Sequence, residues 1–430
     1  MSCNEWREIK LDEIIEFNPK ESISKGKYAK KINMDMLKPF YKYVNEYAME
    51  EYKGGSKFRN GDTIMARITP CLENGKTAKV TLLNKNEVGF GSTEFIVLRA
   101  KEGLTTEDYV YYTAISPDVR DIAIKSMTGT SGRQRAQINV IQNININLPP
   151  LHEQKAIAKI LSDLDEKIEI NNRINKVLEE IAQTIFKRWF IDFEFPNENG
   201  EPYKSSGGEM VESELGPIPK GWDLVELGQF IEIINGYSYK SSELMESNTA
   251  LLTIKNFDVT GNFKINGFKE IKISEKVKEK HYLELFDVVI ACTDLTQNAE
   301  IIGNAIMVMT KSKYKKLIAS MDIIKIVPKS KKITQYTLYM ILKDNRFKKF
   351  ALGLTSGTTV LHLNKKGILN YKVALPIDSY LLEKISCFIE PLIKYMSEIY
   401  SENERLSQLR DTLLPKLMSG EIRVPLDESK

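Results

Sequence analysis

The sequence predicts an α+β protein in which two mixed α/β domains repeat one plan and two long helices accompany them. Three observations lead to this prediction. Strings of residues recur in the same order in both halves of the 430-residue chain. Short β-branched runs between glycines and prolines indicate strands, and two segments of about forty residues carry a heptad pattern. At roughly 100–200 residues per domain, the length allows two or three domains.

The composition excludes several classes of protein. Lys and Arg number 61 against 58 Asp and Glu, a formal net charge of +3, so a single strongly basic domain is excluded although a locally basic face is not. No apolar run approaches the ~20 residues that span a bilayer, and the first residues do not resemble a signal peptide. The four cysteines are too scattered for a disulfide framework or a zinc site. We therefore expect a cytoplasmic protein with no membrane attachment and no metal site.

Four pairs of strings carry the internal repeat. Trp6–Leu11 matches Trp222–Leu227, Gly61–Arg67 matches Phe286–Cys292, Ser92–Val97 matches Ser320–Lys325, and Thr128–Pro149 matches Thr355–Pro376. Each string alone is short enough to recur by chance, but their common order at a nearly constant offset is not. Both halves are therefore expected to fold in the same way.

Each half opens with apolar, β-branched runs that indicate strands because Gly, Asn and Pro separate them. These runs are Thr63–Ile68, Phe95–Leu98, Val288–Cys292, Ile301–Met309 and Ile323–Val327. A stretch between the halves is rich in glycine, proline and serine and indicates a linker. The expected segments are a domain over 1–150, a helix over 151–195, the linker over 196–220, a domain over 221–377, a helix over 378–422 and a tail over 423–430.

Heptads mark the helical segment that closes each half. The expected seam positions are Leu161, Leu164, Ile168, Asn171, Asn175 and Leu178 in the first segment, and Ile389, Leu392, Met396, Ile399, Asn403 and Leu406 in the second. A helix of forty residues is about 60 Å long, which exceeds the diameter of one small domain. We therefore expect the two helices to pair and to act as spacers. The alternative is that each helix covers only its own domain.

Polar residues and a proline interrupt the heptads. A polar side chain at a heptad core position can fix the register of paired helices, and Asn171, Asn175 and Asn403 would do so if they lie in the seam. They would instead face solvent if the pattern slips there. Pro391 lacks a backbone N–H, so it predicts a kink or a late start of the second helix.

The chain carries no recognisable motif for catalysis or cofactor binding. Asn74–Thr77 resembles the end of a phosphate-binding P-loop, but Pro70 stands where that pattern requires glycine. Asn18–Lys20 begins like a motif of amino-methyltransferases but lacks its second proline and its aromatic residue. The sequence therefore predicts a non-catalytic protein.

The most specific strings lie in the helical segments and the linker. They are Leu148–Ala158, Leu161–Ile168, Asn171–Asn175, Leu178–Ala182, Ile185–Phe193, Tyr203–Met210, Ser213–Gly216, Ile218–Trp222, Glu402–Leu406 and Leu409–Ile422. Together with the repeat, they make essentially the whole chain resemble the specificity subunits of type I restriction–modification systems. One departure is the second helical start, Leu375–Tyr380, which lacks the Pro-Pro-Leu-x-Glu-Gln form found at 149–154.

This resemblance implies two target-recognition domains, each reading one half of a split, asymmetric site in double-stranded DNA. Two long antiparallel, coiled-coil-like helices would join them and set the spacing between the halves. The chain would bind no cofactor itself. Two modification (methyltransferase) subunits would bring S-adenosylmethionine, and restriction subunits would bring ATP and Mg.

Two other functions are weighed against this one. A self-contained DNA methyltransferase or endonuclease would need an unrecognised active site, and the absence of a cofactor loop argues against it. A coiled-coil adaptor with no role on nucleic acid does not explain two large, loop-rich domains.

Loops provide the candidate DNA-binding side chains, because Arg can bond guanine and Asn or Gln can bond adenine through two hydrogen bonds. The candidates are Arg67, Thr69, Arg133, Gln134, Arg135 and Gln137 in the first half, and Thr293, Gln297, Thr358, Thr359 and His362 in the second. Different side chains at matching positions would follow if the halves read different sequences. For each residue, a local turn bond or a solvated loop is the alternative.

Two lysine clusters are candidates for contacts to the phosphate backbone, which position a protein on DNA without reading its sequence. They are Lys25, Lys27, Lys30 and Lys31 around Tyr28, and Lys311, Lys313, Lys315 and Lys316 around Tyr314. A merely solvated charged face is the alternative for both.

Overall fold

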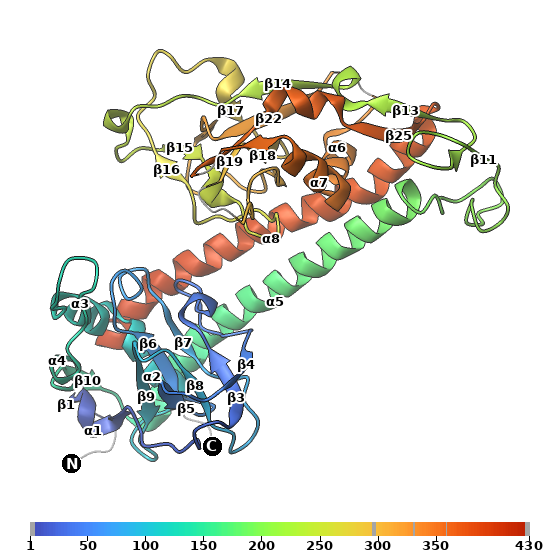
Figure 1. Ribbon diagram of the computed structural model, residues 1–430. Helices are drawn as coiled ribbons and strands as arrows, with labels where there is room; N and C mark the ends of the chain where they lie inside the picture. The colour runs from blue at the N-terminus through green and yellow to red at the C-terminus, as the bar shows by residue number, and fades with distance from the viewer. Residues whose placement is uncertain (1–4, 295–297, 330–331, 358, 426–430) are drawn as a thin grey trace. The chain divides into compact units, whose positions relative to one another are not determined.

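The computed structural model describes residues 5–294, 298–329, 332–357 and 359–425. The chain forms two compact units: unit 1 contains residues 1–170 and 405–430, and unit 2 contains residues 171–404. Both units mix helices and strands, as the sequence predicts (Figure 1). Among the described residues, no helix is long and apolar enough to cross a membrane.

Unit 1 is built from short strands and three short helices in addition to α1. Its elements before the long helix are β1 (Arg7–Lys10), α1 (Leu11–Ile14), β2 (Ile15–Phe17), β3 (Tyr28–Ile32), β4 (Ala48–Glu51), β5 (Ser56–Phe58), β6 (Thr63–Ala66), β7 (Thr77–Lys79), β8 (Gly89–Gly91), β9 (Phe95–Ala100), α2 (Glu107–Ile115), α3 (Pro117–Lys125), α4 (Ile138–Gln142) and β10 (Asn145–Leu148).

Two four-stranded sheets and one strand pair organise unit 1. One sheet has the order β2-β9-β6-β7 and the other β4-β3-β8-β5, in which β3 and β8 run parallel. Strand β1 pairs with β10, so that Arg7 lies opposite Leu148. All four residues of β6 are buried, which explains its continuous apolar run. Helix α2 packs beside this sheet and buries Tyr109, Tyr111 and Tyr112.

Unit 2 contains the linker strands and the second set of mixed elements. They are β11 (Met210–Val211), β12 (Ile218–Pro219), β13 (Trp222–Glu226), β14 (Ile231–Asn235), β15 (Thr249–Leu252), β16 (Lys269–Glu270), β17 (Tyr282–Leu283), β18 (Val288–Ala291), β19 (Thr293–Asp294), β20 (Ala305–Met307), β21 (Lys316–Ala319), β22 (Ile323–Pro328), α6 (Gln335–Lys343), α7 (Asn345–Gly353), β23 (Thr355–Ser356), β24 (Leu361–Leu363) and β25 (Lys372–Pro376).

The topology of unit 2 repeats that of unit 1. Its four-stranded sheets have the orders β14-β22-β18-β20 and β16-β15-β21-β17, again with one parallel pair, β15 and β21. Strand β13 pairs with β25 as β1 pairs with β10. Helices α6 and α7 stand where α2 and α3 stand in the chain of unit 1. The internal repeat that the sequence predicts is confirmed.

Two long helices, α5 (Leu151–Phe190) and α8 (Ser379–Ser419), each supply residues to both units. Helix α8 is continuous through Pro391, so the late start considered for this helix is wrong. The helix ends before Gly420, whose φ of +78° is the left-handed conformation that commonly terminates helices.

The two helices run antiparallel in each unit. In unit 2, Asn171 bonds to Asn403, while Trp189, eighteen positions further along α5, packs edge-on against Phe388, fifteen positions earlier in α8. In unit 1, Asp165 bonds to Arg410, and Glu153 bonds to Arg423 just beyond the end of α8. The helices thus face each other over the residues predicted to form their seam.

The seam residues all lie at least partly inside the protein. Leu161, Ile168, Asn171, Asn175, Ile389, Met396, Ile399 and Asn403 are buried, and Leu164, Leu178, Leu392 and Leu406 are half-buried. The solvent-facing alternative for the three asparagines is therefore excluded. The side chains buried in unit 1 include Ile157, Leu161, Leu414 and Leu417, and those in unit 2 include Phe186, Phe190, Ile385 and Ile389.

An amide cluster lies in the seam of unit 2. Nδ2 of Asn171 donates to Oδ1 of Asn403 (2.8 Å) and to Oε2 of Glu402 (2.7 Å), and Nδ2 of Asn403 donates to Oδ1 of Asn172 (3.0 Å). Asn175 is buried one helical turn further on, and its Oδ1 has no partner among the described residues. Asn171 and Asn175 of the same helix are therefore both buried, but Asn171 is hydrogen-bonded across the seam while the side-chain carbonyl of Asn175 has no partner among the described residues.

A buried ion pair lies between the helices in unit 1. Nη1 of Arg410 donates to Oδ1 of Asp165 (2.6 Å), and the two side chains are only 6% and 4% exposed. The hydroxyl of Tyr112 donates to the other carboxylate oxygen of Asp165 at 2.6 Å. Because the carboxylate of Asp165 on α5 accepts hydrogen bonds from Arg410 on α8 and Tyr112 on α2, it connects the three helices.

Replacing Asp165 with alanine is expected to destabilise unit 1 strongly. The substitution leaves the Arg410 guanidinium buried without its partner, which costs about 3–5 kcal/mol. Asp163→Ala is the matched control, because Asp163 lies on the same helix and forms an exposed ion pair with Lys159 at 2.6 Å, a type of pair worth about 0–1 kcal/mol. Urea unfolding of the two variants measures the difference. Equal unfolding midpoints would contradict the prediction.

The amide cluster predicts opposite effects for two asparagines. Asn171→Leu should lower the free energy of unfolding by about 1–3 kcal/mol, because Oδ1 of Asn403 then lies buried and unpaired. Asn171→Leu combined with Asn403→Leu should recover part of this loss. Asn175→Leu removes a carbonyl that already lacks a partner, so it should be neutral or stabilising. Urea unfolding of the three variants measures these effects, and the idea fails if Asn175→Leu costs as much as Asn171→Leu.

Candidate nucleic-acid interface

A hairpin in unit 1 carries three of the six DNA-binding residues predicted for the first half, Arg133, Gln134 and Arg135. The backbone N–H of Thr128 donates to the carbonyl of Arg135 (3.1 Å), and the N–H of Arg135 donates back (2.9 Å). At the tip, the N–H of Arg133 donates to the carbonyl of Thr130 (2.9 Å). Gly132 has a φ of +79°, which is the conformation that a type II turn needs at its third residue. We call residues 128–135 the recognition hairpin.

The recognition hairpin pairs with the chain that follows β6. The N–H of Ala136 donates to the carbonyl of Arg67 (2.8 Å), and the N–H of Thr69 donates to the carbonyl of Gln134 (3.0 Å). The two candidate sets that the sequence separates by about sixty residues, Arg67 with Thr69 and the 133–137 loop, therefore lie side by side.

Three of the candidate side chains are held by bonds within the protein. Arg135 forms a two-bond ion pair with Glu94, from Nε to Oε2 (2.9 Å) and from Nη2 to Oε1 (2.6 Å). These bonds keep the pKa of Glu94 below its usual range. Nε2 of Gln137 donates to the hydroxyl of Thr128 (2.7 Å), and the hydroxyl of Thr69 donates to Glu73 (2.8 Å).

Other candidate side chains in unit 1 are differently placed. Arg133 is exposed, and none of the described residues bonds to its guanidinium. Gln134 is half-buried, and its side-chain amide likewise has no partner within the described part of the chain. Arg67 is half-buried close to Glu94, where its charge also lowers the pKa of that carboxyl. Arg133 is therefore the candidate most available to an outside ligand.

Unit 2 builds the same framework with other side chains. The N–H of Leu363 donates to the carbonyl of Cys292 (3.0 Å), and the N–H of Cys292 donates to the carbonyl of Asp322 (2.8 Å). In unit 1 the corresponding bonds join Ala136 to Arg67 (2.8 Å) and Arg67 to Glu94 (2.9 Å). By this correspondence Asp322 takes the place of Glu94, and His362 takes the place of Arg135.

Two of the predicted residues of unit 2, Thr293 and His362, also lie together. Thr293 lies opposite His362 where β19 pairs with β24, and its hydroxyl donates to Asp322 at 3.3 Å. Thr359 and His362 are exposed. Gln297 and Thr358 lie outside the described residues.

Glu94 and Asp322 are functional candidates that the sequence analysis did not single out. The signal was present in the match between Ser92–Val97 and Ser320–Lys325, which places an acidic residue at the same position of both repeats. An acidic residue repels DNA phosphates, so the sequence alone does not suggest a role for Glu94 at a DNA interface. Its ion pair with Arg135 suggests one.

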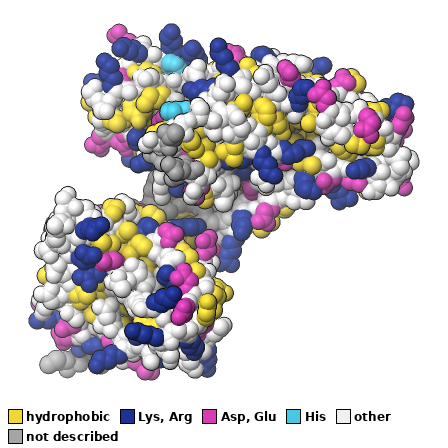
Figure 2. Space-filling view, viewed as in Figure 1, with side chains coloured by type: hydrophobic (Ala, Val, Ile, Leu, Met, Phe, Trp, Pro, Cys, Tyr) yellow, Lys and Arg dark blue, Asp and Glu magenta, His cyan; other side chains and the backbone are white. Residues whose placement is uncertain are grey.

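The lysine clusters are partly neutralised. Lys30 pairs with Glu87 (3.1 Å), Lys31 with Glu50 (2.8 Å) and Lys313 with Glu270 (2.8 Å), and Lys311 pairs with Glu284. Lys25, Lys27, Lys315 and Lys316 are exposed. Figure 2 shows basic and acidic side chains interspersed over the visible face of the molecule. The exposed lysines therefore provide positive charge only locally.

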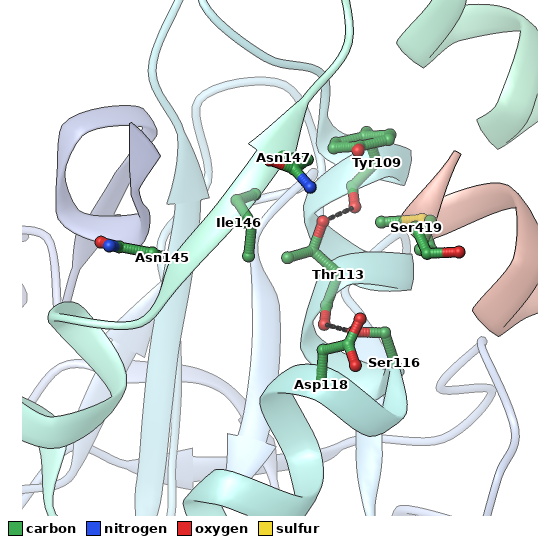
Figure 3. A pocket seen from close by; sticks show the side chains of 9 residues that line it. Tyr109, Thr113, Ser116, Asp118, Asn145, Ile146, Asn147 and Ser419 are labelled. Carbon is green, nitrogen blue, oxygen red and sulfur yellow. Dashed lines mark hydrogen bonds between the residues drawn. The ribbon is translucent and has the colours of Figure 1, made fainter. Parts of the chain in front are cut away.

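Unit 1 also contains a cavity of about 140 Å³. Figure 3 shows its lining side chains from α2, the start of α3, β10 and the end of α8. Two of its hydroxyls bond to nearby carbonyls, Thr113 to Tyr109 and Ser116 to Thr113, both at 2.8 Å. The lining has one acidic side chain, Asp118, and no lysine, arginine, cysteine or histidine. It lacks the paired groups that acid–base or nucleophilic catalysis requires.

Comparison with known proteins identifies the family. The model of the type I restriction modification DNA specificity domain matches residues 4–180 and 219–409. The MjaVIII type I restriction enzyme specificity subunit of Methanocaldococcus jannaschii is 28% identical over 432 residues, covering 98% of this chain and 93% of that protein. The HindI specificity subunit of Haemophilus influenzae is 24% identical and covers 85% of this chain and 87% of that protein.

A solved structure agrees in fold. The crystal structure of the type I restriction–modification S subunit from M. genitalium has a TM-score of 0.52 and 17% identity, and covers 96% of each chain. The two segments that match the family model each contain one of the structural repeats described above. The chain belongs to the family of type I restriction–modification DNA specificity proteins.

Proposed function

We propose that this chain, as the DNA sequence-recognition subunit of a type I restriction–modification complex, reads a bipartite, asymmetric site with one repeat for each half. One observation carries the proposal: both units place a hairpin beside the end of a strand, joined through two corresponding backbone hydrogen bonds and carrying different side chains. A framework of this kind can hold different side chains without changing its backbone. Two such frameworks in one chain would read two different sequences.

The side chains of each framework suit different contacts with bases. Unit 1 offers Arg133 and Gln134, and unit 2 offers Thr359 and His362. Arginine can bond the O6 and N7 atoms of guanine, and glutamine can bond adenine, in the major groove. The exposed lysines at 25, 27, 315 and 316 would contact phosphates, which position the protein but do not specify the sequence.

The long helices would set the distance between the half-sites. We assign 151–195 and 378–422 to spacer helices, 1–150 and 221–377 to target recognition, 196–220 to a linker and 423–430 to a tail. The amide cluster around Asn171 and Asn403 supports this assignment, because buried polar pairs favour one register of paired helices over shifted ones.

The chemistry would reside in partner subunits. Two modification subunits would bind S-adenosylmethionine, and restriction subunits would bind ATP and Mg, while this chain would bind double-stranded DNA and scaffold the complex in the cytoplasm. The non-catalytic role agrees with the name specificity subunit that the relatives carry. The part of the chain that the structure describes contains no cluster of three or more His, Cys, Asp or Glu suited to a metal ion.

Genome-wide mapping of methylation tests the function. Co-expression of the chain with its modification subunit should methylate a split motif, and omission of the chain should abolish that methylation. Exchange of residues 221–377 for the corresponding domain of another family member should change one half of the motif only. Methyl transfer by the isolated chain would instead support a self-contained enzyme, and a change in both halves would contradict the division of labour.

Arg133→Ala should relax the preference at one base-pair position and weaken binding of the full site by about 1–3 kcal/mol. The reason is that the exposed guanidinium has no partner among the described residues and can bond a base edge. Binding of the complex to duplexes with each single base change measures the effect. Lys27→Ala is the control, since loss of a phosphate contact should weaken all sequences equally. Uniform weakening by Arg133→Ala would show that Arg133 contacts phosphate.

A further inference from the structure

We propose that Glu94 is a positioning residue for sequence recognition: by holding Arg135, it orients the recognition hairpin so that Arg133 and Gln134 face the DNA and Arg135 does not. This inference rests on the proposed function of unit 1. It reverses the role that composition suggests for Arg135, because an arginine in a DNA-binding loop is normally the first residue expected to read guanine.

The ion pair between Arg135 and Glu94 restricts the orientation of the arginine side chain. Two hydrogen bonds, of 2.9 and 2.6 Å, join the guanidinium of Arg135 to both oxygens of Glu94. A planar guanidinium bound through two parallel bonds fixes orientation as well as distance. Both nitrogens of this edge are therefore occupied, and the remaining nitrogen, Nη1, donates to the carbonyl of Arg133 at 3.4 Å.

Glu94 holds the hairpin through its backbone as well. Its carbonyl accepts from the N–H of Arg67 (2.9 Å), and the carbonyl of Arg67 accepts from the N–H of Ala136 (2.8 Å). The next residue of the chain, Phe95, begins β9 and lies opposite Ala66 of β6. Since β9 and β6 are the two central strands of this sheet and β6 is fully buried, the ion pair connects the hairpin to the centre of the sheet.

The charges predict an unusual signature for the loss of Glu94. In the protein, the carboxylate and the guanidinium neutralise each other beside the proposed DNA contact. Removing the carboxylate leaves Arg135 with an uncompensated positive charge, which favours phosphates of any sequence. Discrimination between sequences should fall while binding to non-specific DNA becomes tighter. Replacement of a residue that only maintained the fold would instead lower both sequence discrimination and non-specific binding.

The described residues of unit 2 form no ion pair at the corresponding position, so unit 2 serves as an internal reference. Asp322 stands at the position of Glu94, but it accepts a bond from Thr293 at 3.3 Å, and His362 is exposed at the position of Arg135. The half-site read by unit 2 should therefore not depend on Glu94.

The test uses the complex of the full chain with its modification subunits and the variant Glu94→Gln. Binding is measured to the methylated motif, to duplexes with each single base change in either half, and to unrelated DNA. Discrimination should fall about tenfold or more in one half only, and unrelated DNA should bind more tightly. Arg135→Lys keeps the charge but cannot form the two-bond fork, so it should lose discrimination in the same half.

Glu8→Gln is the matched control, because Glu8 is an exposed carboxylate of unit 1 that bonds only to Asn145 among the described residues. It should leave discrimination and non-specific binding unchanged. Equal loss in both halves, or unaltered discrimination in Glu94→Gln, would overturn the inference. So would loss of preference at a single base pair in Arg135→Ala, since that result marks Arg135 as a reader. Failure of the wild-type complex to select a split site would overturn the proposed function instead.

Discussion

The packing of α5 against α8 is the interaction on which the rest of the structure depends. Each helix is about forty residues long and contributes core side chains to both units, such as Leu161 and Leu414 in unit 1 and Phe186 and Ile389 in unit 2. Unit 1 therefore combines the first 170 residues with the last 26 of the chain. Its core cannot be completed until the distal helix is present, so the repeats of the sequence do not correspond to two independent folding units.

Polar residues in this seam serve alignment more than stability. Leucines along two helices pack almost equally well after a shift of one heptad, whereas a buried amide or charge without its partner costs about 1–3 kcal/mol or more. The Asn171–Asn403 pair and the Arg410–Asp165 pair lie at separate places along the two helices. Both pairs form only in one register. A protein whose function depends on the distance between two reading sites would need that restriction.

The sequence predicts the features that depend on local pattern. The strands, the order of the repeat and both long helices follow from alternation, matched strings and heptads. For the seam asparagines, helical phase leaves a buried and a solvent-facing position open, and the structure shows all three buried. The local rule for Pro391 predicted a kink or a late start, but α8 begins at Ser379 because Ile385 and Ile389, before the proline, are already buried in the core of unit 2. Packing on that side outweighs the missing backbone donor.

The candidate site shows what local pattern cannot predict. Arg133 and Arg135 lie two residues apart in the same loop, yet Arg133 is exposed and Arg135 is held by Glu94. Their difference depends on Glu94, about forty residues earlier in the chain, and on a strand pairing that brings residues 67–69 beside residues 134–136. The sequence identifies the loop because glycine and arginine are local signals. It does not show which arginine is available, because that depends on a non-local pair.

The difference between paired and unpaired cations also explains why a formal net charge of +3 is compatible with a DNA-binding role. Non-specific affinity depends on the number of phosphates that unpaired cations neutralise, not on the total charge. In ion pairs such as Lys30–Glu87 and Arg135–Glu94 the cation is already neutralised by a carboxylate, so it adds little to the number of DNA phosphates that the protein can neutralise. The pair still connects two parts of the fold. Fewer free cations weaken binding to every sequence, whereas base contacts favour only the correct one. A nearly neutral protein in which some cations are paired therefore gains selectivity at the expense of affinity for DNA in general.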